Sequence, residues 1–262
     1  MILDIIAESA RKRVLEAKKK ASLEEVSMRA RAISLHEGFP FEKALAAPGM
    51  SFICELKKAS PSKGVISEDF PYLDIAADYE AAGADAISVL TEPEFFLGNN
   101  EYLRETAAAV SLPVLRKDFI IDVWQIYEAK TLGASAVLLI CSLLGEKDLA
   151  AFIQVADSLG LSSLVEVHSE DEARLAASAG SRIIGVNNRD LKTFAVDMNT
   201  SARLRDLIPS GVLAVSESGV KTREDILAMS QIGMDAVLVG EALMKAPDRR
   251  GSLRELKEGK CD

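Results

Sequence analysis

The sequence AAGADAISVL at residues 81–90 repeats in outline as TLGASAVLLI at 131–140 and QIGMDAVLVG at 231–240. Residues 178–186, SAGSRIIGV, follow the same outline more loosely. In each segment the end of an amphipathic helix reaches a glycine, which takes the positive φ that a helix C-terminus needs. A small-residue turn and a nearly continuous apolar run follow, as in parallel strands that helices cover on both faces. These repeats predict strands that alternate with helices.

The same alternation extends from Met50 almost to the C-terminus. It predicts eight strands, at residues 52–57, 86–90, 113–117, 135–140, 162–167, 182–187, 212–217 and 236–240. Helices are expected after them, at residues 71–82, 99–110, 122–132, 146–159, 170–179, 199–207 and 222–232, with a short one from Glu241. Such a series is typical of an α/β protein folded as a (β/α)8 TIM barrel. The alternative is an open doubly wound sheet, but no glycine-rich dinucleotide fingerprint follows the first strand to favour it.

Residues 1–47 differ from the rest of the chain. They are rich in Ala, Glu, Lys and Arg and place apolar residues at helical spacing, which predicts two or three helices with Pro40 in a connecting loop. We expect a single domain, in which this N-terminal helical extension packs on a barrel formed by residues 48–262. Two placements are open. The extension covers the carboxyl ends of the strands and excludes water there, or it caps the opposite end and serves stability alone.

The composition excludes several classes of protein. Lys and Arg number 31 and Asp and Glu 40, a formal charge of −9, so we expect no nucleic-acid partner, because duplex-binding proteins present a basic face. Cys54 and Cys141 lie in apolar runs and are predicted to be buried thiols; with Cys261 they make no disulfide framework. The longest apolar stretch is too short to span a bilayer, and the N-terminus lacks the order of a secretion signal. These features favour a cytoplasmic protein with no membrane partner.

Polar residues gather where the predicted strands end, which is where a barrel enzyme carries its catalytic residues. Side chains alternate along a strand, so Glu55 and Lys57 share one face of the first strand while Cys54 and Leu56 take the other. If the first face points into the barrel, a carboxylate and an ammonium group meet in a partly desolvated cup. The alternative is an exposed strand end with two solvated charges.

Four further strands end in a similar way. Their polar residues, together with an aromatic ring in phase with the lysine, are Lys117, Phe119, Glu166, Asn187, Arg189, Glu217 and Ser218. A structural ion pair would explain any one of these strand ends. Five of them at the same edge of a barrel indicate a catalytic site.

The ends of the seventh and eighth strands carry a separate signal. In this fold their loops often form a phosphate site with the N-terminus of a short helix. Gly219 and Gly240 allow backbone N–H groups to approach an anion, and Glu241 has to turn its side chain away from it.

Other conspicuous residues carry less information. His168 is in phase with Glu166, although a lone histidine is more often structural, and His36 lies in the extension without an assigned role. Trp124 is expected to pack on the helix that follows the third strand. No HxH, HExxH or CxxC spacing is present, so we expect no metal.

Together, these residues resemble the indole-3-glycerol phosphate synthase family of barrel enzymes. The matching segments are ELKKASPSKG (55–64), LRKDF (115–119), LVEVH (164–168), IGVNNRDL (184–191), SESGV (216–220) and VGEALM (239–244). The first and fourth are long and specific in this order and spacing. The resemblance covers nearly the whole chain, and the family also carries helices before its first strand.

The resemblance implies a carboxy-lyase of tryptophan biosynthesis that needs neither metal nor cofactor. Its substrate is 1-(2-carboxyphenylamino)-1-deoxyribulose 5-phosphate, which is cyclised with loss of CO₂ and water to indole-3-glycerol phosphate. Lys117 is implied as the general acid at the ketone oxygen and Glu166 as the general base. Lys57 is a second cation, and Glu55 orients both lysines. Some roles can exchange between the two lysines.

The resemblance also implies how the substrate is held. Its carboxylate end meets Ser60 and Arg189, and its ribulose hydroxyls meet Glu217 and Ser218. Asn187 orients either these hydroxyls or Glu166. The remaining implied contacts are Phe96, Phe119, Leu138 and Leu191 around the anthranilate ring, and Gly219, Gly240 and Glu241 at the phosphate through backbone N–H groups. The expected partner is this small anionic phosphosugar, and the expected oligomeric state is a monomer.

Two other functions remain as alternatives. Another phosphosugar barrel enzyme, such as phosphoribosylanthranilate isomerase, shares the phosphate site but lacks both the ELKKASPSKG loop and the N-terminal helices. A non-enzymatic, metabolite-sensing barrel would keep the phosphate loops and lose the inward lysines. The combination of Lys57, Lys117 and Glu166 argues against it.

Overall fold

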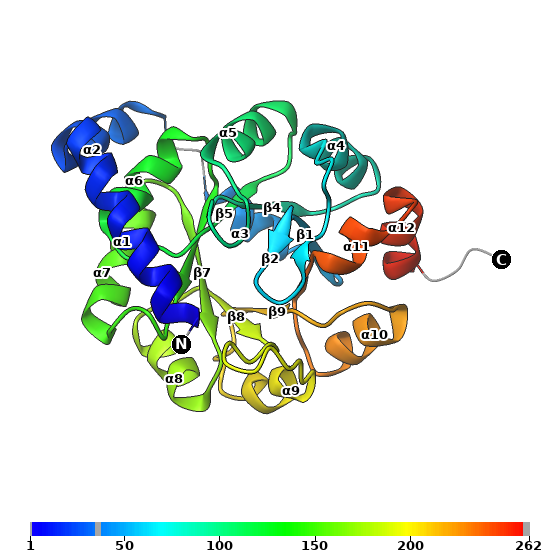
Figure 1. The fold of residues 1–262 in the computed structure, drawn as a ribbon. Helices are drawn as coiled ribbons and strands as arrows, with labels where there is room; N and C mark the ends of the chain where they lie inside the picture. Colours follow the sequence, from blue (N-terminus) through cyan, green and yellow to red (C-terminus); the bar gives the residue numbers. More distant parts are fainter. Residues whose placement is uncertain (1, 35–37, 259–262) are drawn as a thin grey trace.

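The computed structural model describes residues 2–34 and 38–258 and contains a closed barrel of parallel strands (Figure 1). The ring closes at β1, which pairs with β10 on one side and with β4 on the other. The barrel strands are β1 (Ser51–Leu56), β4 (Ala86–Leu90), β5 (Val114–Lys117), β6 (Ala136–Ile140), β7 (Ser162–Val167), β8 (Ile183–Asn187), β9 (Leu213–Glu217) and β10 (Ala236–Val239). The predicted (β/α)8 TIM barrel is confirmed, and the open doubly wound sheet is wrong. His36 and Cys261 lie outside the described residues.

Helices follow the strands and surround the ring (Figure 1). They are α4 (Tyr72–Ala81), α5 (Asn100–Ala109), α6 (Val123–Thr131), α7 (Glu146–Ser158), α8 (Glu170–Ser178), α9 (Asn199–Arg205), α10 (Arg223–Gln231) and α11 (Glu241–Lys245). The predicted ranges ran slightly long because they included the caps. Asn99 and Asp122, for example, are N-caps whose side chains accept hydrogen bonds from backbone N–H groups of α5 and α6.

Three short elements escaped the sequence analysis. The loop after β1 folds into an antiparallel pair, β2 (Ala59–Ser60) with β3 (Gly64–Val65). After α11 the chain forms one more helix, α12 (Arg249–Glu258), which buries Leu253 and Leu256 against the outer layer.

Alternate side chains of the barrel strands enter two separate cores. Ile53, Leu115 and Leu164 belong to the core inside the ring, whereas Cys54 and Leu56 belong to the larger core between ring and helices. The expected alternation along β1 is therefore present. It turns the polar residues at the carboxyl ends of the strands toward the barrel axis.

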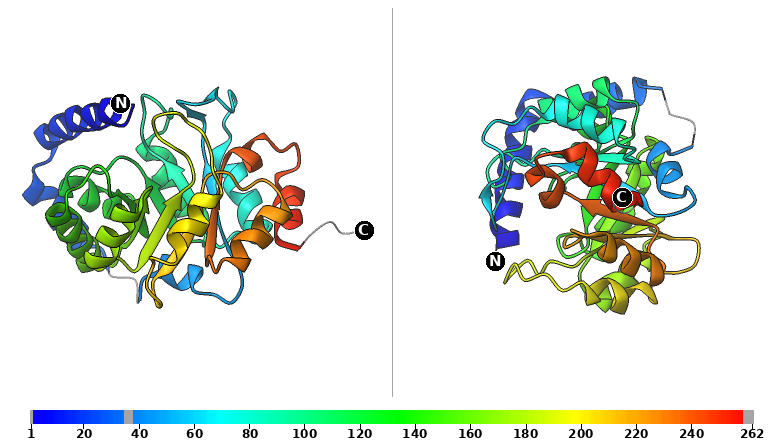
Figure 2. Two further views of the ribbon diagram at one scale, coloured as in Figure 1. Left: turned by 90° about the horizontal axis from the view of Figure 1, so that it is seen from below. Right: turned by 90° about the vertical axis from the view of Figure 1, so that its right-hand side faces the viewer.

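The N-terminal helices reach both ends of the barrel, as Figure 2 shows. Helix α1 (Ile2–Lys20) lies at the carboxyl ends of the strands, and α2 (Leu23–Ala32) packs on α6. Lys18 lies 2.5 Å from Asp122, and Trp124, on the helix after the third barrel strand, donates from Nε1 to the carbonyl oxygen of Ala21 at 3.0 Å.

The opposite end is closed by α3 (Pro40–Leu45). Its Phe41 and Leu45 are buried in the core inside the ring. Pro40 was expected in a connecting loop, but it begins α3, a position at which its missing N–H removes no helical hydrogen bond. The two placements considered for the extension are thus occupied by different helices.

Both cysteines in the described part of the chain are buried free thiols. Burial raises the pKa of Cys141 to about 12, and the pKa of Cys54 is higher still. Among the described residues, no helix is both long and apolar enough to cross a membrane.

Candidate active site

A cavity of about 690 Å³ opens at the carboxyl ends of the barrel strands. Its wall contains every residue that the sequence analysis placed in the site: Glu55, Lys57, Ser60, Phe96, Lys117, Phe119, Leu138, Glu166, Asn187, Arg189, Leu191, Glu217, Ser218, Gly219, Gly240 and Glu241. The closed ring therefore brings all of the proposed site residues into one chamber.

Lys117, the last residue of β5, lies between two buried carboxylates. Its Nζ is 3.2 Å from Oε2 of Glu217 and 3.3 Å from Oε2 of Glu166. Burial by itself lowers the pKa of Lys117, but the charges of Glu217, Glu166 and Glu55 outweigh it and hold this pKa above its usual value. Lys117 is therefore an ammonium group at neutral pH, fixed by its neighbours on the wall of the cavity.

The two carboxylates beside Lys117 differ in their affinity for protons. Burial raises the pKa of Glu217 to about 7, and the charge of Glu166 adds to this effect while Lys117 opposes it. Burial acts on Glu166 as well. There, Lys117, His168 and a hydrogen bond from Asn187 outweigh it and lower the pKa. Glu166 is thus an ionised acceptor, while Glu217 titrates near neutral pH.

Glu55 and Lys57 form a second pair, at the end of β1. Lys57 Nζ donates a hydrogen bond to Oε1 of Glu55, which is buried. The sequence analysis had Glu55 orient both lysines. In the structure it contacts Lys57 directly and acts on Lys117 through its charge.

Two glycines make room for these charged side chains. A Cβ on Gly240 would lie 2.5 Å from Glu55 Oε1 and 2.9 Å from Lys57 Nζ, closer than real Cβ contacts allow. A Cβ on Gly185, in β8, would collide with the carboxylate of Glu217. Gly240 was expected at a phosphate, and its place beside the β1 pair supplies a second reason for a glycine there.

The segment after β8 is held by two asparagines. Asn187 hydrogen bonds Glu166 and accepts the backbone N–H of Arg189 at 3.0 Å. Asn188 was missed by the sequence analysis. It is buried, donates to Ser216 Oγ at 3.0 Å and accepts from Ser201 Oγ at 2.9 Å. The signal for it was a second amide directly after a buried strand.

Aromatic and aliphatic side chains form the apolar part of the wall. The rings of Phe96 and Phe119 lie side by side, with their centroids 5.9 Å apart. Three residues of α1 that the sequence analysis did not place in the site also line the cavity, and these are Ile2, Leu3 and Ile6. Their spacing in the first two turns of a predicted amphipathic helix was the available signal.

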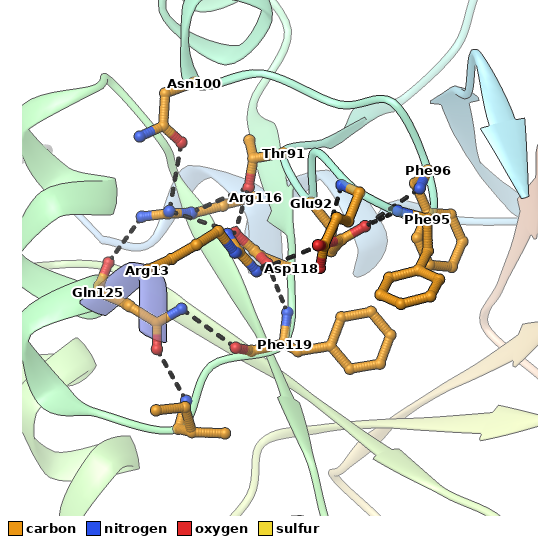
Figure 3. A network of polar contacts seen from close by, with 12 residues as sticks. Arg13, Thr91, Glu92, Phe95, Phe96, Asn100, Arg116, Asp118, Phe119 and Gln125 are labelled. Carbon is orange, nitrogen blue, oxygen red and sulfur yellow. Dashed lines mark hydrogen bonds and ion pairs between the residues drawn. The ribbon is translucent and has the colours of Figure 1, made fainter. Parts of the chain in front are cut away.

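A buried polar network around Asp118 ties α1 to the barrel (Figure 3). Arg13 of α1 donates to both oxygens of Asp118, at 3.1 and 3.4 Å. Asp118 also accepts from Thr91 at 2.7 Å, from Arg116 at 3.3 Å and from the backbone N–H of Phe119 at 2.8 Å. Asp118, the residue after Lys117, is therefore fixed from several sides.

Glu92 extends this network to the loop after β4 (Figure 3). Its carboxylate is buried, lies 3.9 Å from Arg13, and accepts the backbone N–H groups of Phe95 at 2.7 Å and Phe96 at 3.1 Å. The same cation thus faces the carboxylates that fix Phe96 and Phe119. The sequence analysis missed Arg13 because it lies on the N-terminal helix, and it missed Glu92 because it did not search the loop after β4.

The loops after β9 and β10 form the remaining wall. Ser218 and Gly219 adopt positive φ values of 64° and 104°. The side chain of Glu241 is held by lysines, 2.7 Å from Lys245 and 3.8 Å from Lys63. Cations that line this part of the cavity, all missed by the sequence analysis, are Lys63, Lys221 and Lys245. The region is positively charged and suits an anionic group.

The site therefore combines a fixed proton donor, an ionised acceptor, an aromatic wall and a cationic end. Within residues 2–34 and 38–258, no group of three or more His, Cys, Asp or Glu side chains is arranged to hold a metal ion. Such a chamber suits acid–base chemistry on a small molecule that has both an aromatic and an anionic part.

Comparison with known proteins decides the family. A family model described as indole-3-glycerol phosphate synthase matches residues 3–256. The chain belongs to the indole-3-glycerol phosphate synthase family. Proteins of that name from Ruminiclostridium cellulolyticum and Endomicrobium trichonymphae are 57% and 51% identical to this chain. Each alignment covers 98% of this chain, and 99% and 100% of these two relatives, respectively.

Similar solved structures support the fold. A 3-hexulose-6-phosphate synthase superposes with a TM-score of 0.65 at 16% identity, covering 81% of this chain and all of that one. The protein described as KGPDC from Streptococcus mutans gives a TM-score of 0.62 at 14% identity, over 80% and 96% of the two chains. At these identities the likeness concerns the barrel alone.

Membership of the indole-3-glycerol phosphate synthase family also settles the choice between functions. It makes this protein a decarboxylating carboxy-lyase of tryptophan biosynthesis that acts on a small phosphorylated substrate. The isomerase and the metabolite-sensing barrel that the sequence left as alternatives are therefore set aside.

Proposed function

We propose that the protein converts 1-(2-carboxyphenylamino)-1-deoxyribulose 5-phosphate to indole-3-glycerol phosphate by ring closure in this cavity. The residues that carry out the reaction are those predicted from the sequence. The observation that carries this proposal is Lys117, held as an ammonium group between Glu166 and Glu217 on the wall of the cavity. Ring closure develops negative charge on the ketone oxygen of the ribulose chain. A cationic acid at that oxygen lowers the barrier.

Lys117 is the general acid of the first step. The ring carbon that bears the carboxylate attacks the ketone carbon, and Lys117 gives a proton to the ketone oxygen, which becomes a hydroxyl. The carboxylate then leaves as CO₂, and its bonding electrons restore the ring. Lys57, paired with Glu55, is a second cation near the reacting centre and can exchange roles with Lys117.

Glu166 is the general base of the second step. The new hydroxyl takes a proton from Lys57 and leaves as water, while Glu166 takes a proton from the neighbouring carbon of the new ring, which completes the indole. Its lowered pKa keeps Glu166 ionised before this step. Asn187, which donates a hydrogen bond to Glu166, orients the carboxylate.

The rest of the wall holds the substrate. Phe96, Phe119, Leu138 and Leu191 enclose the ring, while Ser60 and Arg189 meet the substrate carboxylate. Glu217 and Ser218 bind the ribulose hydroxyls. The phosphate takes the backbone N–H groups at Gly219, Gly240 and Glu241, in the part of the cavity that also contains Lys63, Lys221 and Lys245.

The proposed enzyme works as a cytoplasmic monomer without metal or cofactor. The two described cysteines, Cys54 and Cys141, are buried free thiols, which suits a reducing compartment. Treatment with EDTA is expected to leave turnover unchanged. Turnover abolished by EDTA and restored by a divalent cation would contradict the metal-free mechanism, and sedimentation velocity at assay concentration checks the monomer.

The direct test is indole fluorescence on mixing the purified protein with the synthetic substrate. We expect fluorescence to grow with time and CO₂ to be released in equal amount. No indole signal from the folded protein would overturn the proposed function. A signal without release of CO₂ would contradict the proposed order of bond changes.

A further inference from the structure

His168 stands just outside the catalytic cavity, behind Glu166. It follows β7, and its side chain is 17% exposed. Nε2 lies 3.4 Å from Oε1 of Glu166, and Nδ1 lies 3.4 Å from Oε2 of Glu172. The imidazole is therefore placed between two carboxylates. Only one of them, Glu166, lines the catalytic cavity.

The ring is held firmly on its outer side. Glu172 Oε2 accepts the backbone N–H of His168 at 2.8 Å, so side chain and backbone of the histidine share one acceptor. Glu172 in turn sits in the first turn of α8, where its backbone N–H donates to Ser169 Oγ. These contacts fix the direction in which Nε2 points.

His168 Nε2 is buried and has no hydrogen bond of normal geometry within the described part of the chain. A buried donor without a partner is costly. Glu166 Oε1 faces it at 3.4 Å, and a small closing movement makes a charge-assisted hydrogen bond. The other oxygen of Glu166, Oε2, faces Lys117. The two oxygens of the base thus have separate partners.

The other charged groups around His168 favour its cationic form. Burial alone lowers the pKa of His168, but the hydrogen bond to Glu172 and the charges of Glu166, Glu172 and Glu217 raise it above the usual value. On the outer side His168 borders a second cavity of about 420 Å³. Charged residues that line this cavity are Glu172, Arg189, Asp190, Lys192, Asp197 and Arg203.

We propose that His168 is a positioning residue for the general base: its Nε2–H holds Oε1 of Glu166, and Oε2 remains free for Lys117 and the substrate. The inference rests on the proposed function only in calling Glu166 the base. The contact between the two side chains is a separate claim. Its chemical consequence is that the carboxylate keeps one orientation and a low affinity for protons until the dehydration step.

Two variants separate the hydrogen bond from the charge. His168→Leu removes both, so we expect kcat to fall roughly tenfold, as for the loss of a charge-assisted hydrogen bond, with KM changed less than twofold. The acidic limb of the kcat/KM profile moves to higher pH, because the positive charge that lowers the pKa of Glu166 is gone. His168→Gln restores a donor without the charge. This variant should recover most of kcat, while the acidic limb of its kcat/KM profile stays at the higher pH.

A matched control removes stability without touching this contact. Ala176→Gly weakens α8 from its buried side, and an alanine side chain makes no hydrogen bond or ion pair with His168 or Glu166. It should lower the melting temperature and leave the pH profile at its wild-type position. The proposal is overturned if His168→Leu behaves like Ala176→Gly, with kcat and the acidic limb of the pH profile both unchanged.

An experiment without turnover keeps this inference separable from the proposed function. In protein with ¹³C-labelled glutamate carboxyls, the Glu166 signal is assigned by its loss in Glu166→Gln. Its pKa should rise in His168→Leu. A rise in a protein that forms no indole supports the contact and rejects the proposed function. An active wild type without such a rise supports the function and rejects this inference.

Discussion

The charge of Lys117 depends on three carboxylates rather than on solvent. Burial alone lowers its pKa, and the charges of Glu217, Glu166 and Glu55 outweigh burial and raise it. Any proton that Lys117 gives to the substrate is therefore recovered readily from solvent before the next turnover. The acid is strong enough to act only where negative charge develops beside it.

Lys117→Ala should lose roughly 10²–10⁴-fold in turnover, which is the range for one positioned acid, and should largely keep its affinity for product. Lys117→Arg retains the cation between the carboxylates but cannot release its proton, so it should fold well and still be impaired. Single-turnover fluorescence and product titration measure the two effects. Turnover near the wild-type rate in folded Lys117→Ala would remove Lys117 from the acid role.

Glu217 makes stability depend on pH in a defined direction. Its pKa is about 7 in the folded protein and near 4.5 when unfolded, so the folded state binds more protons between these values. The stabilisation is complete below about pH 4.5 and is lost as the pH rises through 7. We expect the free energy of unfolding of the wild type to fall relative to Glu217→Gln between pH 5 and 8. Parallel pH curves for the two proteins would show that Glu217 titrates normally.

The position of a single residue was predictable where the alternation of side chains along a strand decides whether the residue faces the inside or the outside of the barrel. Glu55, Lys57 and Glu166 reached the cavity for that reason. Pairing was not predictable, because Lys117 on β5 meets Glu166 on β7 and Glu217 on β9, which are not its neighbours in the ring. Such contacts depend on how the sheet closes, and they have no signature in any of the three segments.

Helix α1 acts on the site through a cation as well as through its apolar residues. Arg13 faces Asp118 and Glu92, and these carboxylates accept the backbone N–H groups of Phe119 and Phe96. Removing the cation takes one partner from each of the buried carboxylates of Asp118 and Glu92. We expect both carboxylates to move toward water, which solvates their charge. The two rings of the apolar wall move with them.

Arg13→Leu should therefore raise KM by roughly tenfold, about the value of one charge-assisted hydrogen bond, and lower kcat less. Lys19→Ala is the matched control. Lys19 lies on the same helix and pairs with Glu16 on the exposed surface. Steady-state kinetics of both variants checks this. An equal KM in the two would show that α1 touches the site through its apolar residues alone.

Elements were predictable where apolar periodicity and caps coincide, as in α5 and α8. The β2–β3 pair is two residues long on each side and has no periodicity to detect. Helix α12 buries only Leu253 and Leu256 among charged residues. Its position depends on packing against α4 and α10, which no local pattern encodes.

At the scale of the molecule, the extension separates activity from stability. Residues of α1 line the cavity, whereas Phe41 of α3 is buried at the other end of the barrel. Removing residues 1–34 should raise KM far more than it lowers the melting temperature. Phe41→Ala should cost about 3–5 kcal/mol of stability and leave KM unchanged. Calorimetry and kinetics on both proteins test this. A truncated protein with full catalytic efficiency would exclude α1 from the active site.

The closure of the barrel between β1 and β10 also has a consequence for synthesis on the ribosome. Ser51 of β1 pairs with Ala236 of β10. One edge of β1 therefore stays unpaired until β10 has been synthesised. Lys18 of α1 cannot form its ion pair until Asp122 has been synthesised, 104 residues later. At about 5–20 residues per second, that interval alone lasts roughly 5–20 s. Helix α1 is made before the barrel but is among the elements that dock late, so the nascent chain must keep the apolar face of this helix and an open strand edge from other partners in the meantime.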